Sequence, residues 1–576
     1  MAFTPDWTQT QPEHRWEILR CQSRFALWAL FSSIGGMMTG IFLFPFCAFQ
    51  HHFSDLLAGF DWGVSSNAAS LPAFQIQFGK PYPTAPSGYI IPANYLSGWS
   101  GAASGGDIVG ILIAGQLIEW VGRKHSLLIG SVITAIGVGM QIGSSEWILF
   151  LCGRLVNGTH HGPHFVELQE LILVLAIGFG IVYILSPVWI GETVRPELRG
   201  FYLCFMNGSI VFGQLLLAVV AKGISTIDSH WSYRILIILQ LAFVVPLLVI
   251  YPWFPESPYY LFKRGKPEKA RKALNRIHGS SDQALIDAEM HRIRSNFEYS
   301  ESLRMAAAQD GTPLLVQCFK GPNLRRTLIA ILPTVEQVCV GSTFVLGFIT
   351  YFMSLLEIHD FFTVTVVLSV VMLLSSMAAF PLIEAVGRRQ LLIPGTFSLT
   401  AALLVMGITG CFSAKAAVWV FLVSVFLWAI VYQATLGAIG FAFGAEIPSL
   451  PLRSSSVSLM GFSQMAGVWV VSVVLPYLIN PDAANLGAKL GFIFFGLSLP
   501  VCVLMYFYIP ETKGLTFEEL DYLFVSKTSC RKFQTVIKER RMLAENALEI
   551  EVKGAIITTK ASENGARVGH IENSTV

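Results

Sequence analysis

The sequence predicts an all-α membrane protein whose twelve transmembrane helices form two six-helix halves. Of its 576 residues, 53% are hydrophobic and only 13% are charged, whereas soluble domains carry about 25% charged residues. Apolar stretches recur along the chain, each near the ~20 residues needed to cross a bilayer. A polar segment rich in Lys and Arg lies in the middle and divides these stretches six and six.

The apolar stretches account for ten spans directly. They lie at 99–118, 126–143, 201–221, 235–253, 327–352, 361–383, 391–411, 418–444, 456–479 and 488–509. The regions 25–79 and 147–191 supply one further span each, although each region is too long for a single helix. The sequence therefore predicts twelve spans.

The spans divide the chain into five segments. These are an N-terminal segment at 1–24, a six-helix bundle at 25–255, a polar loop at 256–326, a second six-helix bundle at 327–509 and a tail at 510–576. The first segment is polar and charged, so we expect no cleavable signal peptide. Basic residues fall in alternate short loops, a pattern typical of cytoplasmic loops. We therefore expect both termini and the polar loop on the cytoplasmic side, with the plasma membrane as the location.

The two halves repeat each other. The stretches "GQLIEWVGRKHSLLIG" (115–130) and "PLIEAVGRRQLLIPG" (381–395) share the pattern LIExVGR[KR]. The stretches "GETVRPELRG" (191–200) and "GAEIPSLPLRS" (444–454) share Glu, Pro and Arg with one Glu-to-Arg interval. A duplicated membrane unit is typical of transporters, which bind their substrate between the repeats.

Three further stretches complete a set of signatures. They are "PVWIGETVRPELRG", "PESPYYLFKRGKPEKA" and "PETKGLTFEELDYLF", after the fourth, sixth and twelfth spans. Together with the two GR[KR] loops they resemble the sugar porter family of the major facilitator superfamily, over about residues 20–525. The stretches "LPAFQIQFG", "QVCVGSTFVLGFITYF" and "NLGAKLGFIFFG" look most like fungal α-glucoside (maltose-type) and hexose permeases. The resemblance implies the major facilitator fold and transport without covalent chemistry.

Two charged residues inside predicted spans are candidates for proton coupling. Asp61 falls in the first span and Arg154 in the fourth, where an ionisable side chain is costly and marks function. In this respect the chain resembles proton-coupled sugar porters, which have an Asp and an Arg at these two motif positions. The resemblance thus implies that Asp61 carries the proton and that Arg154 is its switchable partner. A static ion pair and an uncoupled facilitator are the alternatives.

The repeated loop motifs predict a cytoplasmic gate. Glu192 and Glu446 are placed to pair with Arg123 and with Arg388 or Arg389 when the cytoplasmic side is closed. Loops that only set topology are the alternative. The predicted gate residues are Gly115, Glu119, Gly122, Arg123, Lys124, Glu192, Arg199, Glu384, Gly387, Arg388, Arg389, Glu446 and Arg453.

Polar and aromatic residues within spans are candidates for sugar contacts. Sugars are uncharged, so amides and hydroxyls are the side chains that recognise them. Asn207 and Gln214 lie seven residues apart, on one helix face. The full set is Asn207, Gln214, Glu336, Gln337, Ser342, Thr343, Tyr351, Phe441 and Gln464. Packing between helices is the alternative role for each.

Two segments of similar length, 41–59 and 159–176, break the family pattern. Each interrupts a helix within its motif and brings histidines and acids near membrane depth. Each follows a glycine, whose codon can supply the start of an intron. We interpret both as translations of retained introns. Genuine insertions, or a metal site joining His51, His52, His160, His161 and His164, are the alternatives. A mature transcript that keeps both segments would contradict the intron hypothesis.

The sequence thus predicts a sugar transporter that works by alternating access, as a proton symporter of an α-glucoside or hexose. It is not expected to be an enzyme. Its expected partners are a sugar, a proton and the lipid bilayer, with no nucleic acid, no metal and no cofactor, and we expect a monomer. A sugar sensor of the same fold, or a facilitator or polyol porter for inositol or quinate, are the alternatives.

Overall fold

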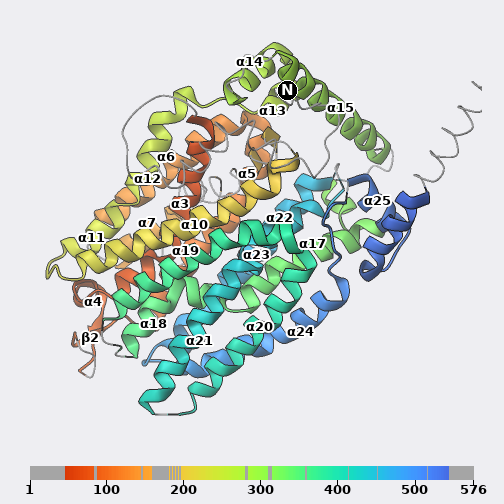
Figure 1. The fold of residues 1–576 in the computed structure, drawn as a ribbon. Coiled ribbons are helices and arrows are strands. Elements are labelled where there is room, and N and C mark those ends of the chain that lie inside the picture. The colour runs from red at the N-terminus through yellow and green to blue at the C-terminus, as the bar shows by residue number, and fades with distance from the viewer. Residues whose placement is uncertain are drawn as a thin grey trace, which may run out of the picture.

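The computed structural model describes residues 46–543, apart from 84–86, 145–146, 158–180, 182–184, 186–187, 190–191, 194–195, 279–282, 309–313, 357, 359, 413, 450–451 and 516. Within these residues the chain is almost entirely helical. Long helices run side by side in one bundle (Figure 1). A single two-stranded antiparallel sheet, β1 (Lys80–Pro81) with β2 (Tyr89–Ile90), lies at one end of the bundle.

The N-terminal half consists of seven described helices. They are α3 (Phe46–Ala69), α5 (Ala93–Val121), α6 (Arg123–Ile142), α7 (Trp147–Asn157), α10 (Pro196–Ile224), α11 (Trp231–Ile238) and α12 (Leu241–Ile250). The short 3-10 helix η3 (Tyr251–Trp253) continues α12.

The C-terminal half is built in the same way. Its membrane helices are α17 (Gly321–Cys339), the π-helical η4 (Thr343–Phe348), α18 (Ile349–Leu355), α19 (Phe361–Val386), α20 (Arg388–Thr409), α21 (Lys415–Ala434), α22 (Leu436–Glu446), α23 (Arg453–Ile479) and α24 (Leu490–Tyr508). The 3-10 helix η6 (Gly487–Lys489) leads into α24.

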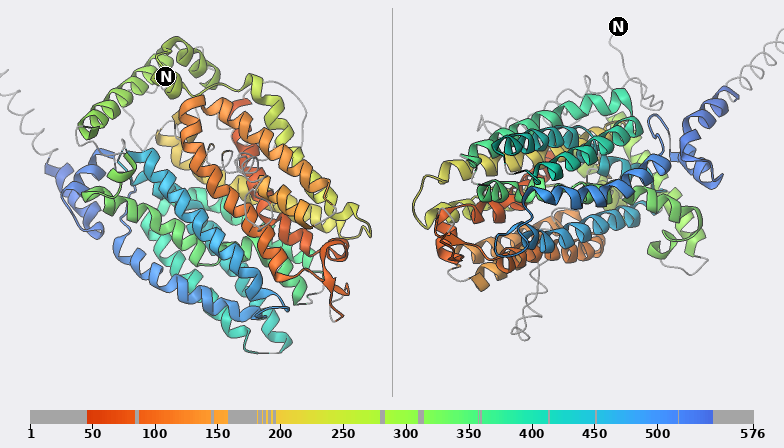
Figure 2. Two further views of the ribbon diagram at one scale, coloured as in Figure 1. Left: turned by 180° about the vertical axis from the view of Figure 1, so that it is seen from behind. Right: turned by 90° about the horizontal axis from the view of Figure 1, so that it is seen from below.

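Helices outside the bundle collect at its two ends (Figures 1 and 2). At one end lie α13 (Pro258–Lys263), α14 (Pro267–His278), α15 (Gln283–Ala308), α16 (Leu314–Gln317), α25 (Phe517–Val525) and η7 (Cys530–Lys532). The helix α4 (Pro72–Phe78) lies at the opposite end with the hairpin β1–β2. The first group comes from the polar loop and the tail, which are too polar to enter the bilayer.

The spans agree with those expected. In the described part of the chain, nine helices are long and apolar enough to cross a membrane, and a tenth span is α17 with η4 and α18, bent by 42°. The two expected spans outside this count are α3, which carries acids and serines, and α7, whose described part ends at Asn157. Gly341 causes the bend, because its φ of +80° ends the helix that precedes η4.

The helix α3 packs closely on α10. A Cβ on Gly59 would lie 1.8 Å from the carbonyl oxygen of Ile210, and one on Gly213 would lie 2.2 Å from that of Leu56. Glycine at both positions therefore lets the two backbones approach directly.

The helix α3 includes most of the first predicted insert, 41–59. From residue 46 onward the segment 41–59 continues as helix into Asp61 and does not interrupt the span. Its side chains allow this, because the stretch "FCAFQHHFSDLLAG" contains neither proline nor an interior glycine. The second insert, 159–176, lies outside the described residues. A helix says nothing about splicing, so the intron hypothesis stays a prediction.

Candidate functional site

The two halves enclose a cavity of about 80 Å³ between the helices of the bundle. The N-terminal half lines it from α3, α5 and α7, and the C-terminal half from η4, α21 and α23. The residues are Asp61, Trp62, Ser65, Ser66, Ser100, Ala103, Ser104, Asp107 and Arg154, with Ser342, Thr343, Leu346, Gly347, Phe348, Tyr432, Gln464, Val468 and Ser472. A second cavity of about 40 Å³ shares Trp62, Leu346, Tyr432 and Gln464 with the first.

Asp61 and Arg154 form the ion pair that the sequence predicts. Arg154 donates from Nη1 to Oδ1 of Asp61 over 2.7 Å, and both side chains are buried. Gln240, also buried, donates to the same carboxylate oxygen over 3.1 Å. Gln240 lies in the turn between α11 and α12 and was not among the predicted site residues, although an amide within an apolar span is a signal of a polar contact. Asp61 thus accepts from Arg154 on α7 and from Gln240 in this turn.

A second carboxylate enters the same cavity from α5. Asp107 is buried and lies within electrostatic range of Asp61 and Arg154. Sequence reasoning missed it. The signal was present, because Ser100, Ala103, Ser104 and Asp107 follow the spacing of one helix face, and all four line the cavity.

Amides from both halves line the second cavity. Asn207 donates to Oε1 of Gln433 over 2.9 Å. Gln464 donates to Oε1 of Gln337 over 2.6 Å, and Gln337 donates to the carbonyl of Leu436 over 2.9 Å. These residues come from α10, α17, α21 and α23, so the amide network joins the two halves. Gln433 was not among the predicted residues.

Several polar atoms facing these cavities have no hydrogen-bond partner in the described part of the protein. They are both amide atoms of Gln214, Oε1 of Gln464, Oγ1 of Thr343, Oγ of Ser65 and Ser100, and Nε of Arg154. A buried polar atom without a partner is costly. The hydroxyl groups of a ligand carry both the donors and the acceptors that such atoms need.

The other predicted sugar-contact residues are placed differently. Ser342 lines the first cavity. Glu336 lines neither and accepts a hydrogen bond from Ser498 over 2.7 Å. Tyr351 is buried and donates to Asn480 over 2.8 Å. Their roles as sugar contacts stay predictions, and the side chain of Phe441 lies outside the described residues.

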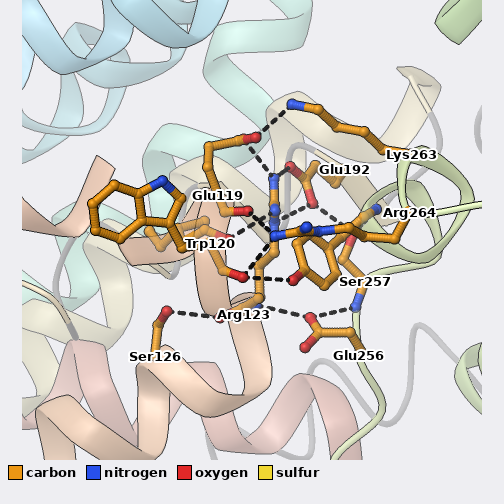
Figure 3. Close-up of polar contacts among 12 residues, drawn as sticks. Glu119, Trp120, Arg123, Ser126, Glu192, Glu256, Ser257, Lys263 and Arg264 are labelled. Atoms are coloured by element: carbon orange, nitrogen blue, oxygen red, sulfur yellow. Dashed lines mark hydrogen bonds and ion pairs between the residues drawn. The ribbon is translucent and has the colours of Figure 1, made fainter. Parts of the chain in front are cut away.

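At the end that carries α13 to α15, Arg123 is the centre of a polar cluster (Figure 3). Its guanidinium forms an ion pair with Glu192, with Nε 2.9 Å from Oε2. Ser257 donates to the same Glu192 oxygen over 2.6 Å. Glu119 accepts from both Arg123 and Lys263. The predicted Arg123–Glu192 pair is therefore present, within the N-terminal half.

The C-terminal half has the equivalent cluster. Arg388 donates from Nη2 to Oε1 of Glu446 over 3.1 Å, and Thr512 donates to the other oxygen of Glu446 over 2.8 Å. Each arginine thus pairs with the glutamate of its own half. The side chains of three predicted gate residues lie outside the described part, namely Arg199, Glu384 and Arg453, and so do the surroundings of Gly115.

Two glutamates that sequence reasoning missed complete these clusters. Glu256 accepts from the backbone N–H of Arg123 over 2.8 Å and of Lys124 over 3.3 Å. Glu511 accepts from the backbone N–H groups of Arg388 and Arg389, both over 3.0 Å. Each glutamate caps the helix that starts after a glycine with positive φ, which is Gly122 or Gly387. The Pro-Glu pair shared by "PESP" and "PETK" was the available signal.

The two halves are joined at the opposite end of the bundle. Asp482 accepts from the backbone N–H of Ala93, the first residue of α5, over 3.0 Å. Asn480 donates to the carbonyl of Ile91 over 2.7 Å, and Ser97 donates to that of Val473 over 2.7 Å. At the surface Lys222 forms an ion pair with Asp360. These contacts link the N-terminal to the C-terminal half at this end.

The described residues hold no group of three or more His, Cys, Asp or Glu that could bind a metal ion. Of the histidines considered for such a site, His160, His161 and His164 lie outside the described residues, as do the side chains of His51 and His52.

Comparisons with known proteins give one consistent family. The family described as "Sugar (and other) transporter" matches residues 47–524. The chain is 27% identical to the MFS transporter fmqE of Aspergillus fumigatus, over 90% of this chain and 91% of that protein. It is 26% identical to the general alpha-glucoside permease of Saccharomyces cerevisiae, over 84% of this chain and 75% of the permease.

Two further similarities extend this result. The high glucose sensor RGT2 of Saccharomyces cerevisiae is 25% identical over 86% of this chain, which spans 63% of the sensor. Among solved structures, the proton:xylose symporter XylE, a major facilitator protein bound to 6-bromo-6-deoxy-D-glucose, superposes with a TM-score of 0.64. It is 22% identical and covers 82% of this chain and 98% of the symporter. This similarity establishes the major facilitator fold.

Proposed function

This chain belongs to the sugar (and other) transporter family, and we propose that it carries a sugar across the plasma membrane together with a proton. It is a multi-pass membrane protein of the major facilitator fold and not an enzyme. The substrate we propose is an α-glucoside or a hexose. The coupling ion is a proton, and no other cofactor is required.

The unpartnered polar atoms of the two cavities support a sugar as the substrate. Gln214, Gln464 and Thr343 offer donors and acceptors that no described residue satisfies. The described residues lining the second cavity carry no charge, so an uncharged polyhydroxyl ligand fits this surface. Trp62 and Tyr432 add aromatic surface for the apolar faces of a sugar ring. The general alpha-glucoside permease among the relatives favours an α-glucoside.

The buried Asp61–Arg154 pair supports proton coupling. A proton that binds Asp61 neutralises the carboxylate and frees Arg154, so the ion pair can exist in two states. Gln240 donates to Asp61 in the ionised state and stabilises it. The XylE neighbour is named as a proton symporter, which fits this proposal.

Alternating access follows from the cross-half contacts. The end with Asp482, Asn480 and Lys222 is joined across the halves, and we assign it to the extracellular side. The basic loops and the arginine clusters then face the cytoplasm, with both termini. Rocking of the halves would break the outer contacts and open the cavities to the outside.

A sugar sensor of the same fold is the second candidate, because the high glucose sensor RGT2 is among the relatives. Uptake of labelled maltose and glucose in yeast that lacks hexose transporters separates the candidates. Uptake that a protonophore abolishes supports symport. Uptake that a protonophore leaves unchanged indicates a facilitator, and absence of uptake by protein present at the membrane indicates a sensor.

A further inference from the structure

Asp107 is a buried acid that the proposed coupling pair does not use. It lies in the middle of α5, faces the larger cavity and is 7% exposed. No described residue donates a hydrogen bond to its carboxylate, and its neighbours on the same helix face are Ser100, Ala103 and Ser104. An acid in a membrane helix without a structural partner marks a functional position.

The charges around Asp107 are unbalanced. Asp61 on α3 is paired with Arg154 on α7 and also accepts from Gln240. Among the described lining residues of η4, α21 and α23, the one ionisable group is the phenol of Tyr432. One guanidinium therefore faces two carboxylates. With both acids ionised the cavity carries one excess negative charge, and a single bound proton removes it.

Arg154 has room for a second acceptor. Its buried Nε–H has no hydrogen-bond partner among the described residues, whereas Nη1 is bonded to Asp61. Asp107 lies within electrostatic range of both members of the pair. A guanidinium presents several donors in a planar fork and can serve two carboxylates in turn.

We propose that Asp107 is a second proton-binding residue of the transport cycle and that it shares Arg154 with Asp61. The proton enters the cavity and binds a carboxylate oxygen of Asp107, while Asp61 keeps the guanidinium. Release of this proton leaves Asp107 as a competing acceptor for Arg154, which loosens Asp61. This inference rests on the proposed symport and adds a second group to it.

The test is the pH dependence of transport by the full chain. Asp107→Asn fixes the neutral form with nearly the same shape. We expect this variant to reach the membrane and to exchange labelled for unlabelled sugar, because the neutral form is a normal state of the cycle. We expect loss of sugar accumulation, loss of the sugar-induced rise in medium pH and a flat pH profile of uptake. Asp107→Glu should recover all three, because it restores a carboxylate.

The results that contradict the role of Asp107 differ from those that contradict the proposed symport. Accumulation with an unchanged pH profile in Asp107→Asn overturns the proposal, and so does loss of sugar exchange by variant protein that is present at the membrane. Glu298→Gln, an acid-to-amide change in the exposed Arg294–Glu298 pair of α15, is the control that should change nothing. If the unmodified chain takes up sugar without a rise in medium pH, the proposed symport itself fails.

Discussion

The two halves of this protein are alike at one end and different in the middle. At the end that carries α13 to α15, each half pairs an arginine with a glutamate, as Arg123–Glu192 and Arg388–Glu446. Each half also caps the arginine's helix with a second glutamate, Glu256 or Glu511. The duplicated motifs thus fold into duplicated clusters.

The cavities show the difference. Of their described lining residues, the three that carry charge at neutral pH are Asp61, Asp107 and Arg154, all in the N-terminal half. The C-terminal half contributes amides, hydroxyls and aromatic rings, such as Gln337, Gln464 and Tyr432. Under the proposed symport, this division separates two tasks: the N-terminal half would bind the proton, and the C-terminal half would bind much of the sugar.

The largest effect is expected from the loss of Arg154, the one cation among the described residues that line the cavities. Arg154→Gln leaves Asp61 buried without an ionic partner, a change that costs about 3–5 kcal/mol. We expect uptake to fall by about a hundredfold or more. The double variant Asp61→Asn with Arg154→Gln removes both charges and should recover the amount of folded protein in the membrane, but not sugar accumulation. Labelled-sugar uptake with surface quantification measures both, and accumulation by the single variant would contradict the assignment.

A smaller effect is expected when an uncharged lining residue of the C-terminal half is changed. Gln464→Leu removes an amide that lines both cavities and should raise the KM for sugar by about tenfold, the value of one or two hydrogen bonds. The sugar-to-proton ratio should stay unchanged, because no charge is altered. Gln214→Leu is the matched change in the N-terminal half, and its amide has no partner whose loss could disturb the fold. A changed coupling ratio in either variant would contradict the division of tasks.

The comparison also explains what the sequence could predict. Apolar stretches predict the spans, because each span is local in the sequence. The loop motifs predict the arginine pairs, because they recur at matching positions in the two halves. Asp107, Gln240 and Gln433 were missed because their importance depends on which helices meet in space. Glu336 was expected at the cavity, but it contacts Ser498 instead, since its helix face turns toward α24.

Substitution of the two capping glutamates tests whether the two arginine clusters contribute equally to transport. Glu256→Gln and Glu511→Gln each remove a charge from a helix N-terminus, which costs about 0.5–2 kcal/mol. Because both clusters have the same design, we expect both variants to slow transport by a similar factor, about three- to tenfold. Initial rates of uptake at saturating sugar measure this. A large effect in one half and none in the other would mean that only one cluster controls the cytoplasmic side.

The smallest effect is expected at the exposed Lys222–Asp360 pair, which links the two halves at the end opposite the arginine clusters. The hydrogen bond from Lys222 and a second one from Thr363 hold the pKa of the Asp360 carboxylate below its ordinary value. A depressed pKa means that the contact is fully present above the ordinary value, about 4, and is lost as pH falls through the lower one. Lys222→Gln should therefore change uptake by less than about twofold at neutral pH, as is usual for surface ion pairs. Raising the salt concentration should reproduce this small change in the unmodified chain, because salt screens exposed charges. A loss of uptake as large as that in Arg154→Gln would show that the Lys222–Asp360 contact, and not the buried charges of the N-terminal half, limits transport.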